Sequence, residues 1–318
     1  MLTDLIYVAV GLVLLVLAGD ALVRGAVNLS LRLGIPALVV GLTVVAFGTS
    51  APELLVSVKA VLDGVSGIAL GNVVGSNIAN VLLVLGIPAI ISTIHSSTLG
   101  LTRGYLTMIA STLLFIAVAF VGPITWWHGL ILLVGLCFML FDNYRAAQAH
   151  RRAAKGAPAE EEELEGADPS MPWWKIAAFL VAGLIGLPLG AELLVSGAAD
   201  IARVYGISET VIGLTLVAVG TSLPELATSV IAAFKKQADV AMGNVIGSNV
   251  FNLLGIIGVA GIVGPIEVPA SMLREDLWVM LASSLVLIPF IMGRFDITRI
   301  VGFAFVATYI AYTISLVI

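Results

Sequence analysis

Charged residues are scarce in this sequence. Only 11% of its 318 residues are Asp, Glu, Lys or Arg, whereas 60% are hydrophobic, and the mean hydropathy is +1.12. An ordinary soluble domain carries about 25% charged residues, so the composition excludes that class and indicates an integral membrane protein. The sequence also lacks a basic patch, which argues against a nucleic-acid partner and leaves the lipid bilayer as the expected surroundings.

Cysteine and histidine are equally rare. The single cysteine, Cys137, excludes an intramolecular disulfide and lies in an apolar run, where we expect a packing role. The three histidines, His95, His128 and His150, fall in loops or at the edges of hydrophobic runs, and we expect no metal role from them. Zinc, copper and nickel favour thiolate or imidazole ligands, so they are not the expected cations. We expect no resident cofactor either.

Long hydrophobic runs are what the sequence has in abundance. Ten of them have the roughly twenty residues that a helix needs to cross a bilayer. They lie near residues 5–24, 37–61, 67–92, 104–122, 126–144, 174–197, 209–233, 240–263, 275–292 and 298–317. All should be helices, because backbone in lipid must satisfy its own hydrogen bonds. We therefore predict an all-α integral membrane protein with a five-helix unit at 1–145, a linker at 146–172 and a second five-helix unit at 173–318.

A long segment with polar residues occurs twice. Residues 41–86 and 213–258 align without a gap at an offset of 172, and 24 of the 46 positions are identical. The identities include one acid in each copy, Glu53 and Glu225, together with hydroxyl and amide residues. Acids within membrane spans are costly and are usually kept for function. We interpret the two copies as the halves of one duplicated cation site.

The duplication also predicts the topology. Moving a unit by five spans, an odd number, reverses its orientation, so the two units should be inverted-topology repeats, which are typical of secondary transporters. With the N-terminus outside, only three of the fifteen basic residues, Lys59, Arg203 and Arg274, fall on the outer side. Because cytoplasmic loops are rich in Lys and Arg, we expect both termini outside, the linker 146–172 inside, and the chain in the cytoplasmic membrane.

The motif GTSAPE predicts a broken helix at mid-membrane. Pro52 has no backbone N–H, and its ring clashes with the carbonyl of Gly48, so the second span should break between them. Irregular backbone at this depth is tolerated only where it is buried in protein or lines a cavity. The break frees carbonyl oxygens and places Glu53 in the first turn of the helix that follows.

The spacing of the polar residues indicates an all-oxygen shell. Ala46, Ser50 and Glu53 are spaced for one helical face, and Ser76 and Asn80 are four residues apart on the next span. Carboxylate, hydroxyl, amide and backbone oxygens are the ligands that hard cations such as calcium prefer. The motif therefore predicts a site for a hard cation.

GTSAPE with GNVVGSN, and GTSLPE with GNVIGSN, closely resemble the two repeats of the sodium/calcium exchanger family. The resemblance implies ion binding between the second, third, seventh and eighth spans, with Glu53 and Glu225 as the principal carboxylates. It also implies that the first and sixth spans slide as a pair across this core, and that three sodium ions exchange for each calcium. The other implied ligands are the hydroxyls, or the nearby backbone, of Thr49, Ser50, Thr221, Ser222, Ser76 and Ser248, and the carbonyls of Ala46 and Ala218.

Asn80 and Asn252 depart from the pattern of some family members, which carry an aspartate at one of these positions. The site therefore has two carboxylates rather than three, which leaves ion number and any dependence on potassium or protons open. The linker is too short for the large calcium-sensing domain of animal exchangers. Asp20 and Glu192, in the first span of each unit, lie near predicted helix ends, and we interpret them as reaching the membrane interface.

These features predict a secondary antiporter that exchanges Ca²⁺ for Na⁺, without catalytic residues, and that works as a monomer. A Ca²⁺/H⁺ antiporter of the same superfamily is the alternative, although such members typically carry an acid in a GNxxE-type motif instead of GTSxPE. An intramembrane enzyme is a remote alternative, because the two acids have matching hydroxyl-rich surroundings rather than a catalytic arrangement. A channel is also remote, because inverted repeats with broken helices favour alternating access.

Overall fold

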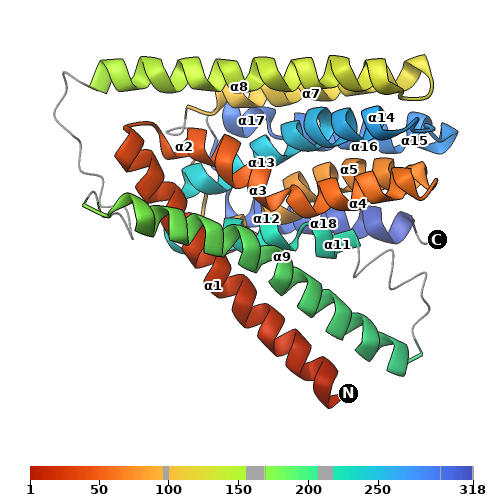
Figure 1. The fold of residues 1–318 in the computed structure, drawn as a ribbon, viewed down its shortest axis with the longest axis horizontal. Helices are drawn as coiled ribbons and strands as arrows, with labels where there is room; N and C mark the ends of the chain where they lie inside the picture. The colour runs from red at the N-terminus through yellow and green to blue at the C-terminus, as the bar shows by residue number, and fades with distance from the viewer. Residues whose placement is uncertain (96–99, 155–167, 169, 207–217, 294, 317–318) are drawn as a thin grey trace.

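The computed structural model describes residues 1–95, 100–154, 168, 170–206, 218–293 and 295–316. Regular structure in these ranges is helical, with two isolated antiparallel bridges and no strand. Four helices are long and continuous (Figure 1): α1 (Leu2–Leu33), α7 (Thr102–Val121), α8 (Trp126–Ala154) and α9 (Trp173–Val204). The predicted all-α fold class is confirmed.

The other helices are interrupted, some by π-helical segments (η). The first motif copy and the residues beside it form α2 (Ala37–Val40), η1 (Gly41–Val45), α3 (Ala46–Thr49), α4 (Ala51–Leu62), α5 (Ser66–Ala79), η2 (Asn80–Val84) and α6 (Gly86–Ile91). The second forms α11 (Ala218–Thr221), α12 (Leu223–Phe234), α13 (Ala238–Val250), η5 (Phe251–Ile256) and α14 (Ile257–Val263). The chain ends with α15 (Ala270–Arg274), α16 (Asp276–Leu285), α17 (Ile288–Ile291) and α18 (Arg299–Ser315).

Length and hydropathy identify six membrane-spanning candidates in the described chain, and the bent segment α2–α4 is a seventh. Shorter apolar helical stretches occupy three more of the predicted positions: Leu223–Phe234, Asp276–Ile291 and Arg299–Ser315. Residues 209–217 of the predicted seventh span lie outside the described residues. The count of ten membrane crossings stays a prediction.

Three helices run past their predicted ends. α9 continues to Val204, beyond the predicted end at residue 197, so Glu192 lies inside the helix rather than near its end. α1 continues to Leu33 and stops at Gly34, whose φ of 65° is a left-handed conformation that suits glycine. The predicted end at residue 24 was therefore wrong, and Asp20 lies well inside the helix. α8 continues to Ala154, because the Ala, Arg and Gln residues of the early linker are good helix formers. The described residues omit 155–167 and 169 of the predicted linker.

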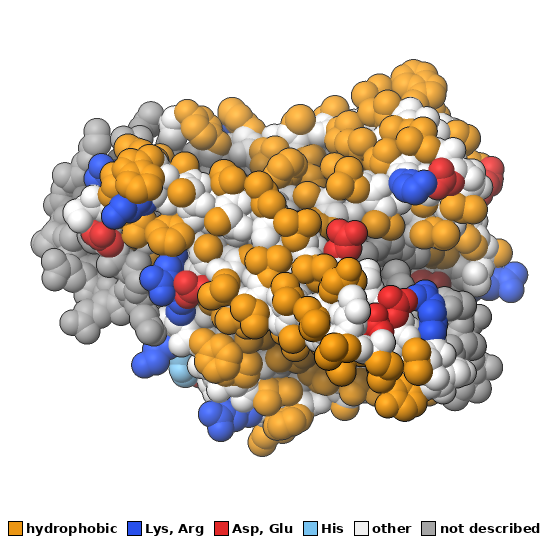
Figure 2. All heavy atoms as spheres, turned by 60° about the horizontal axis from the view of Figure 1, so that its bottom comes forward, with side chains coloured by type: hydrophobic (Ala, Val, Ile, Leu, Met, Phe, Trp, Pro, Cys, Tyr) orange, Lys and Arg blue, Asp and Glu red, His pale blue; other side chains and the backbone are white. Residues whose placement is uncertain are grey.

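The helices of the two motif copies form the centre of the bundle. In the apolar middle part of each stretch, 78% of the residues of Ser66–Ile91 and 83% of those of Ala238–Val263 are buried, compared with 33% for α1 and 28% for α9. Figure 1 shows α1 and α9 crossing each other on one side of this core, and α7 and α8 on the other. Hydrophobic side chains cover most of the face seen in Figure 2, as expected where helices meet lipid.

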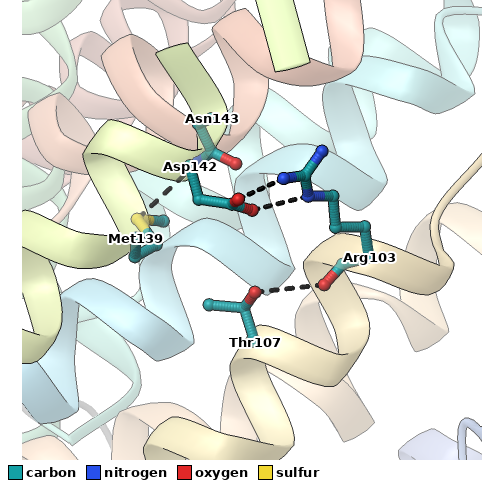
Figure 3. A network of polar contacts seen from close by, with 5 residues as sticks. All are labelled: Arg103, Thr107, Met139, Asp142 and Asn143. Carbon is teal, nitrogen blue, oxygen red and sulfur yellow. Dashed lines mark hydrogen bonds and ion pairs between the residues drawn. The ribbon is translucent and has the colours of Figure 1, made fainter. Parts of the chain in front are cut away.

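α7 and α8 are joined by an ion pair near one end (Figure 3). The Arg103 guanidinium donates two hydrogen bonds to the Asp142 carboxylate, one of them from Nε at 2.5 Å. The Thr107 hydroxyl donates to the Arg103 carbonyl at 3.1 Å, and the Asn143 amide contacts the Met139 sulfur at 3.6 Å. A bidentate pair of this kind fixes the orientation of two neighbouring helices.

Candidate functional site

The predicted break in the second span is present. The axes of the segments Ala37–Thr49 and Ala51–Leu62 differ by 43°, and Ser50 between them has φ −83° and ψ 5°. Pro52 lies in the first turn of α4, where its missing N–H costs no intrahelical bond, and Glu53 follows in the same turn. The second copy has the same local structure, because Ser222 has φ −88° and ψ 3°.

Both carboxylates of the motif are fully buried. Glu53 and Glu225 have 0% exposure, and the Ser50 hydroxyl donates to Glu225 Oε1 at 3.1 Å. Glu225 Oε2 and both carboxylate oxygens of Glu53 have no hydrogen-bond partner among the described residues. A buried, unpartnered carboxylate is strongly destabilising unless a cation or proton neutralises it. The hydrogen bond from the first copy to the second shows that the two copies meet.

Two asparagines form hydrogen bonds between the copies that the sequence analysis did not predict. The Asn72 amide donates to the Glu53 carbonyl at 3.4 Å and to the Ser57 hydroxyl at 3.1 Å. Its oxygen accepts the Thr221 hydroxyl of the other copy at 3.3 Å.

Asn244 makes the equivalent bonds at an offset of 172. Its amide donates to the Glu225 carbonyl and to the Ser229 hydroxyl, both at 3.3 Å, and its oxygen accepts the Thr49 hydroxyl at 3.1 Å. Our candidate ligands did not include Asn72 or Asn244. Their identity in the two copies, four residues before Ser76 and Ser248, was the available signal.

The asparagines of the third and eighth predicted spans also meet. The Asn80 amide donates to the Asn249 oxygen at 3.0 Å, and the Asn249 amide donates to the Asn77 carbonyl at 3.4 Å. Asn252 is fully buried, and neither atom of its side-chain amide has a partner within the described residues. The side-chain oxygens of Asn77 and Asn80 are likewise unpartnered there.

The remaining predicted ligands lie in the same region. Thr49, Ser76, Ser222 and Ser248 are buried, and the Ser248 hydroxyl approaches the Asn244 oxygen at 3.5 Å. The Ala46 carbonyl accepts the Ser50 N–H at 3.1 Å and the Thr49 hydroxyl at 3.4 Å. Ala218 begins α11, and its side chain lies outside the described residues.

The donor set fits a hard cation. In the described chain, the buried oxygens without a hydrogen-bond partner are Glu53 Oε1 and Oε2, Glu225 Oε2, Asn77 Oδ1, Asn80 Oδ1, Asn252 Oδ1 and Ser222 Oγ. All except that of Asn77 belong to predicted ligands. Buried polar atoms are normally satisfied, so a group of unpartnered oxygens marks a place where a ligand supplies the missing interactions. Carboxylate and neutral oxygens together suit calcium. They also suit sodium, which carries a smaller charge.

Comparisons with known proteins agree with this chemistry. The family model described as sodium/calcium exchanger protein matches residues 3–143 and 175–318. The putative antiporter CaxA of Alkalimonas amylolytica is 39% identical over 91% of this chain and 89% of its own length. The sodium/calcium exchanger MaX1 of Methanosarcina acetivorans is 34% identical over 96% of both chains. A solved structure of the sodium-calcium exchanger NCX_Mj superposes with a TM-score of 0.83 at 33% identity, covering 98% of both chains.

Proposed function

Because the chain belongs to the sodium/calcium exchanger family, we propose that it is a secondary antiporter that exchanges Ca²⁺ for Na⁺ across the cytoplasmic membrane. The observation that carries the proposal is the group of buried, unpartnered oxygens around Glu53, Glu225 and Asn252. Transport, rather than catalysis, is what a family of exchangers performs. Calcium and sodium are therefore substrates, and the monomer is the working unit.

The proposed architecture is ten spans in two inverted units, 1–145 and 173–318, joined by a cytoplasmic linker, with both termini outside. Hydrogen bonds that recur at an offset of 172 support it. Asn72 and Asn244 bond to equivalent groups in their own copy and to the equivalent threonine of the other copy. Such reciprocal contacts are what a pseudo-two-fold axis between inverted repeats produces.

In this proposal, each copy contributes one carboxylate and a set of neutral oxygens to a shared site at mid-membrane. Glu53 and Glu225 supply the charge that attracts the cation. Hydroxyls, amide oxygens and the carbonyls freed at the two helix breaks replace its hydration shell. The asparagine bonds between the copies hold the two broken helices in place. The pair α1–α9 then moves across this core, so that the site opens to one side of the membrane at a time.

Proton coupling is the second candidate. Glu53 has two unpartnered carboxylate oxygens among the described residues, and a proton could neutralise that group as well as a cation. The GTSxPE motif in both copies favours sodium. The two candidates make opposite predictions about which gradient drives calcium movement.

The decisive experiment uses the purified full chain in proteoliposomes. Uptake of calcium-45 is measured with an outward sodium, potassium or proton gradient imposed separately. We expect the sodium gradient to drive uptake and a proton gradient of similar size to have no effect. Uptake that followed the pH gradient and ignored sodium would replace the proposal with Ca²⁺/H⁺ exchange. Calcium flux that no counter-gradient influenced would indicate a channel.

A further inference from the structure

The pair α1–α9 is symmetric in itself. A Cβ atom placed on Gly11 of α1 would lie 2.6 Å from the Leu194 nitrogen, and one placed on Gly183 of α9 would lie 2.6 Å from Leu22 Cβ. These two contacts are equivalent at an offset of 172. Glycine permits this close approach, and a stripe of small residues lets two helices pack as one unit.

The contact between this pair and the core is not symmetric. Gly19 of α1 packs on α12, where a Cβ atom would lie 3.2 Å from Ile231 Cγ1 and 3.4 Å from the Ala227 carbonyl oxygen. The residues on α4 that correspond to Ala227 and Ile231 are Leu55 and Lys59. Leu55 is 72% exposed and the Lys59 side chain 76% exposed. α1 therefore covers α12, whereas α9 leaves the equivalent face of α4 uncovered.

An ion pair lies at the covered contact. Lys235, directly after α12, places its Nζ 2.5 Å from Asp20 Oδ1, and Arg24 Nε lies 2.8 Å from Asp20 Oδ2. The Lys235 side chain is only 12% exposed, compared with 32% for Asp20. A partly buried pair between two helices is screened less by water and salt than a surface pair.

Exchanging the roles of the two units brings other charges together. Glu192 of α9 takes the place of Asp20, and Ala191 takes the place of Gly19. Lys59 then occupies the position of Ile231, against Ala191 and beside the Glu192 carboxylate. In the described pose Lys59 is paired with Asp63 at 2.6 Å, and Glu192 is exposed. Asp63, an acid, takes the place of Lys235, so Lys59 would then lie between two acids, Glu192 and Asp63, and would neutralise both.

We propose that two alternative ion pairs latch the two access states, Asp20–Lys235 in the pose described here and Glu192–Lys59 in the opposite pose. The inference rests on the proposed antiport. Each latch belongs to one pose only, so movement of the α1–α9 pair breaks one as it makes the other. Asp20, Lys235, Glu192 and Lys59 are thus positioning residues for alternating access and do not touch the transported ions.

The latches are tested by cross-linking in the full chain. In a Cys137→Ser background, the pair Leu55→Cys and Ala191→Cys should form a disulfide only when α9 covers α4. The rate of cross-linking therefore reports the population of the opposite pose. We expect Asp20→Asn to raise this rate about two- to fivefold and Glu192→Gln to lower it by a similar factor, as loss of a partly exposed ion pair implies.

Several variants keep the test independent of folding defects. Lys235→Met should act like Asp20→Asn, Lys59→Met should act like Glu192→Gln, and the charge exchange Asp20→Lys with Lys235→Asp should restore the original rate. Asp142→Asn, which breaks the ion pair between α7 and α8, is the matched control and should leave the rate unchanged. Shifts in the same direction for Asp20→Asn and Glu192→Gln, or no cross-link in any variant, would overturn the latches.

Failure of the latches and failure of the antiport proposal are distinguishable. Cross-linking is measured without calcium or sodium gradients, so opposite shifts can be observed whatever ion couples to calcium. Sodium-driven uptake together with an unchanged rate of cross-linking would contradict the latches and leave the antiport proposal intact. Opposite shifts in the rate of cross-linking without sodium-driven uptake would support the latches and contradict only sodium as the coupling ion.

Discussion

The two motif copies have nearly the same polar residues but differ in some of their hydrogen bonds. The Ser50 hydroxyl donates to Glu225, whereas the equivalent hydroxyl of Ser222 and both carboxylate oxygens of Glu53 have no partner among the described residues. Asn80 likewise donates to Asn249, whereas the amide of Asn252 lacks a partner there. Similar sequences therefore give the two copies partly different hydrogen-bond arrangements.

This difference indicates how a duplicated site can hold ions of different charge. Both carboxylate oxygens of Glu53 and the amide oxygen of Asn252 are unpartnered in the described chain, while the carboxylate of Glu225 is already partly satisfied by Ser50. Because the copies are related by the repeat, the reverse pattern should arise when the α1–α9 pair occupies its opposite pose. We infer that the asymmetry belongs to the access state rather than to the sequence of either copy.

The largest expected effect comes from removing either charge. Glu53→Gln and Glu225→Gln should each abolish calcium exchange, a loss of more than about 100-fold, because calcium affinity depends strongly on ligand charge. Calcium-45 exchange by the purified variants is the measurement, with folding checked by monodispersity in detergent. Near-normal transport by either variant would contradict the assignment of both carboxylates to the site. It would also show that the two copies do not contribute equally to ion binding.

A smaller effect follows from the total charge of the two copies. Two carboxylates give the site a charge of −2, so one calcium neutralises it and three sodium ions leave +1. Moving one charge through the membrane is worth about 2.3 kcal/mol per 100 mV, enough to shift the exchange equilibrium more than tenfold. With a fixed sodium gradient, an inside-positive potential should increase calcium-45 accumulation by sodium-loaded vesicles.

That test uses a potential set by potassium and valinomycin, after potassium has been excluded as a substrate. Accumulation that is insensitive to potentials of either sign would instead favour two sodium ions per calcium.

The equivalent hydrogen bonds of Asn72 and Asn244 should contribute equally to the stability of the protein. Asn72→Ala and Asn244→Ala each remove equivalent hydrogen bonds, partly buried around Asn72 and buried around Asn244, so each should destabilise the protein by about 1–3 kcal/mol. Melting temperatures in detergent with EDTA provide the comparison, and Asn143→Ala on the outer helix α8 is the control with little expected change. A large difference between the two variants would show that the hydrogen bonds linking the copies are not equivalent.

The last expected effect is a difference in stability between variants of the two serines. Without ions, Ser50→Ala loses a hydrogen bond to a buried carboxylate, which costs about 1.5–3 kcal/mol, whereas Ser222→Ala removes a hydroxyl that has no described partner. We therefore expect a lower melting temperature for Ser50→Ala than for Ser222→Ala in ion-free detergent. Equal melting temperatures would mean that the asymmetry of the two copies does not persist in solution.

The sequence by itself determined the helices, the duplication and the broken span. Hydropathy and length select the apolar runs, and Pro52 interrupts its helix for reasons that lie within four residues of it. Helix ends were less predictable, because the extension of α1 to Gly34 depends on packing against α9 along its whole length. The candidate ligands followed from the identity of the two copies, although whether they bind ions stays a prediction.

Only the tertiary structure decided which residues of one copy meet which residues of the other. The bonds Ser50–Glu225, Thr49–Asn244 and Asn80–Asn249 join residues 169 to 195 positions apart, and local propensity contains no information about such pairs. The same holds for the cover of α12 by α1 and the exposure of α4. Local sequence does not determine which of the two faces is covered, so the choice between them depends on where the α1–α9 pair lies against the core.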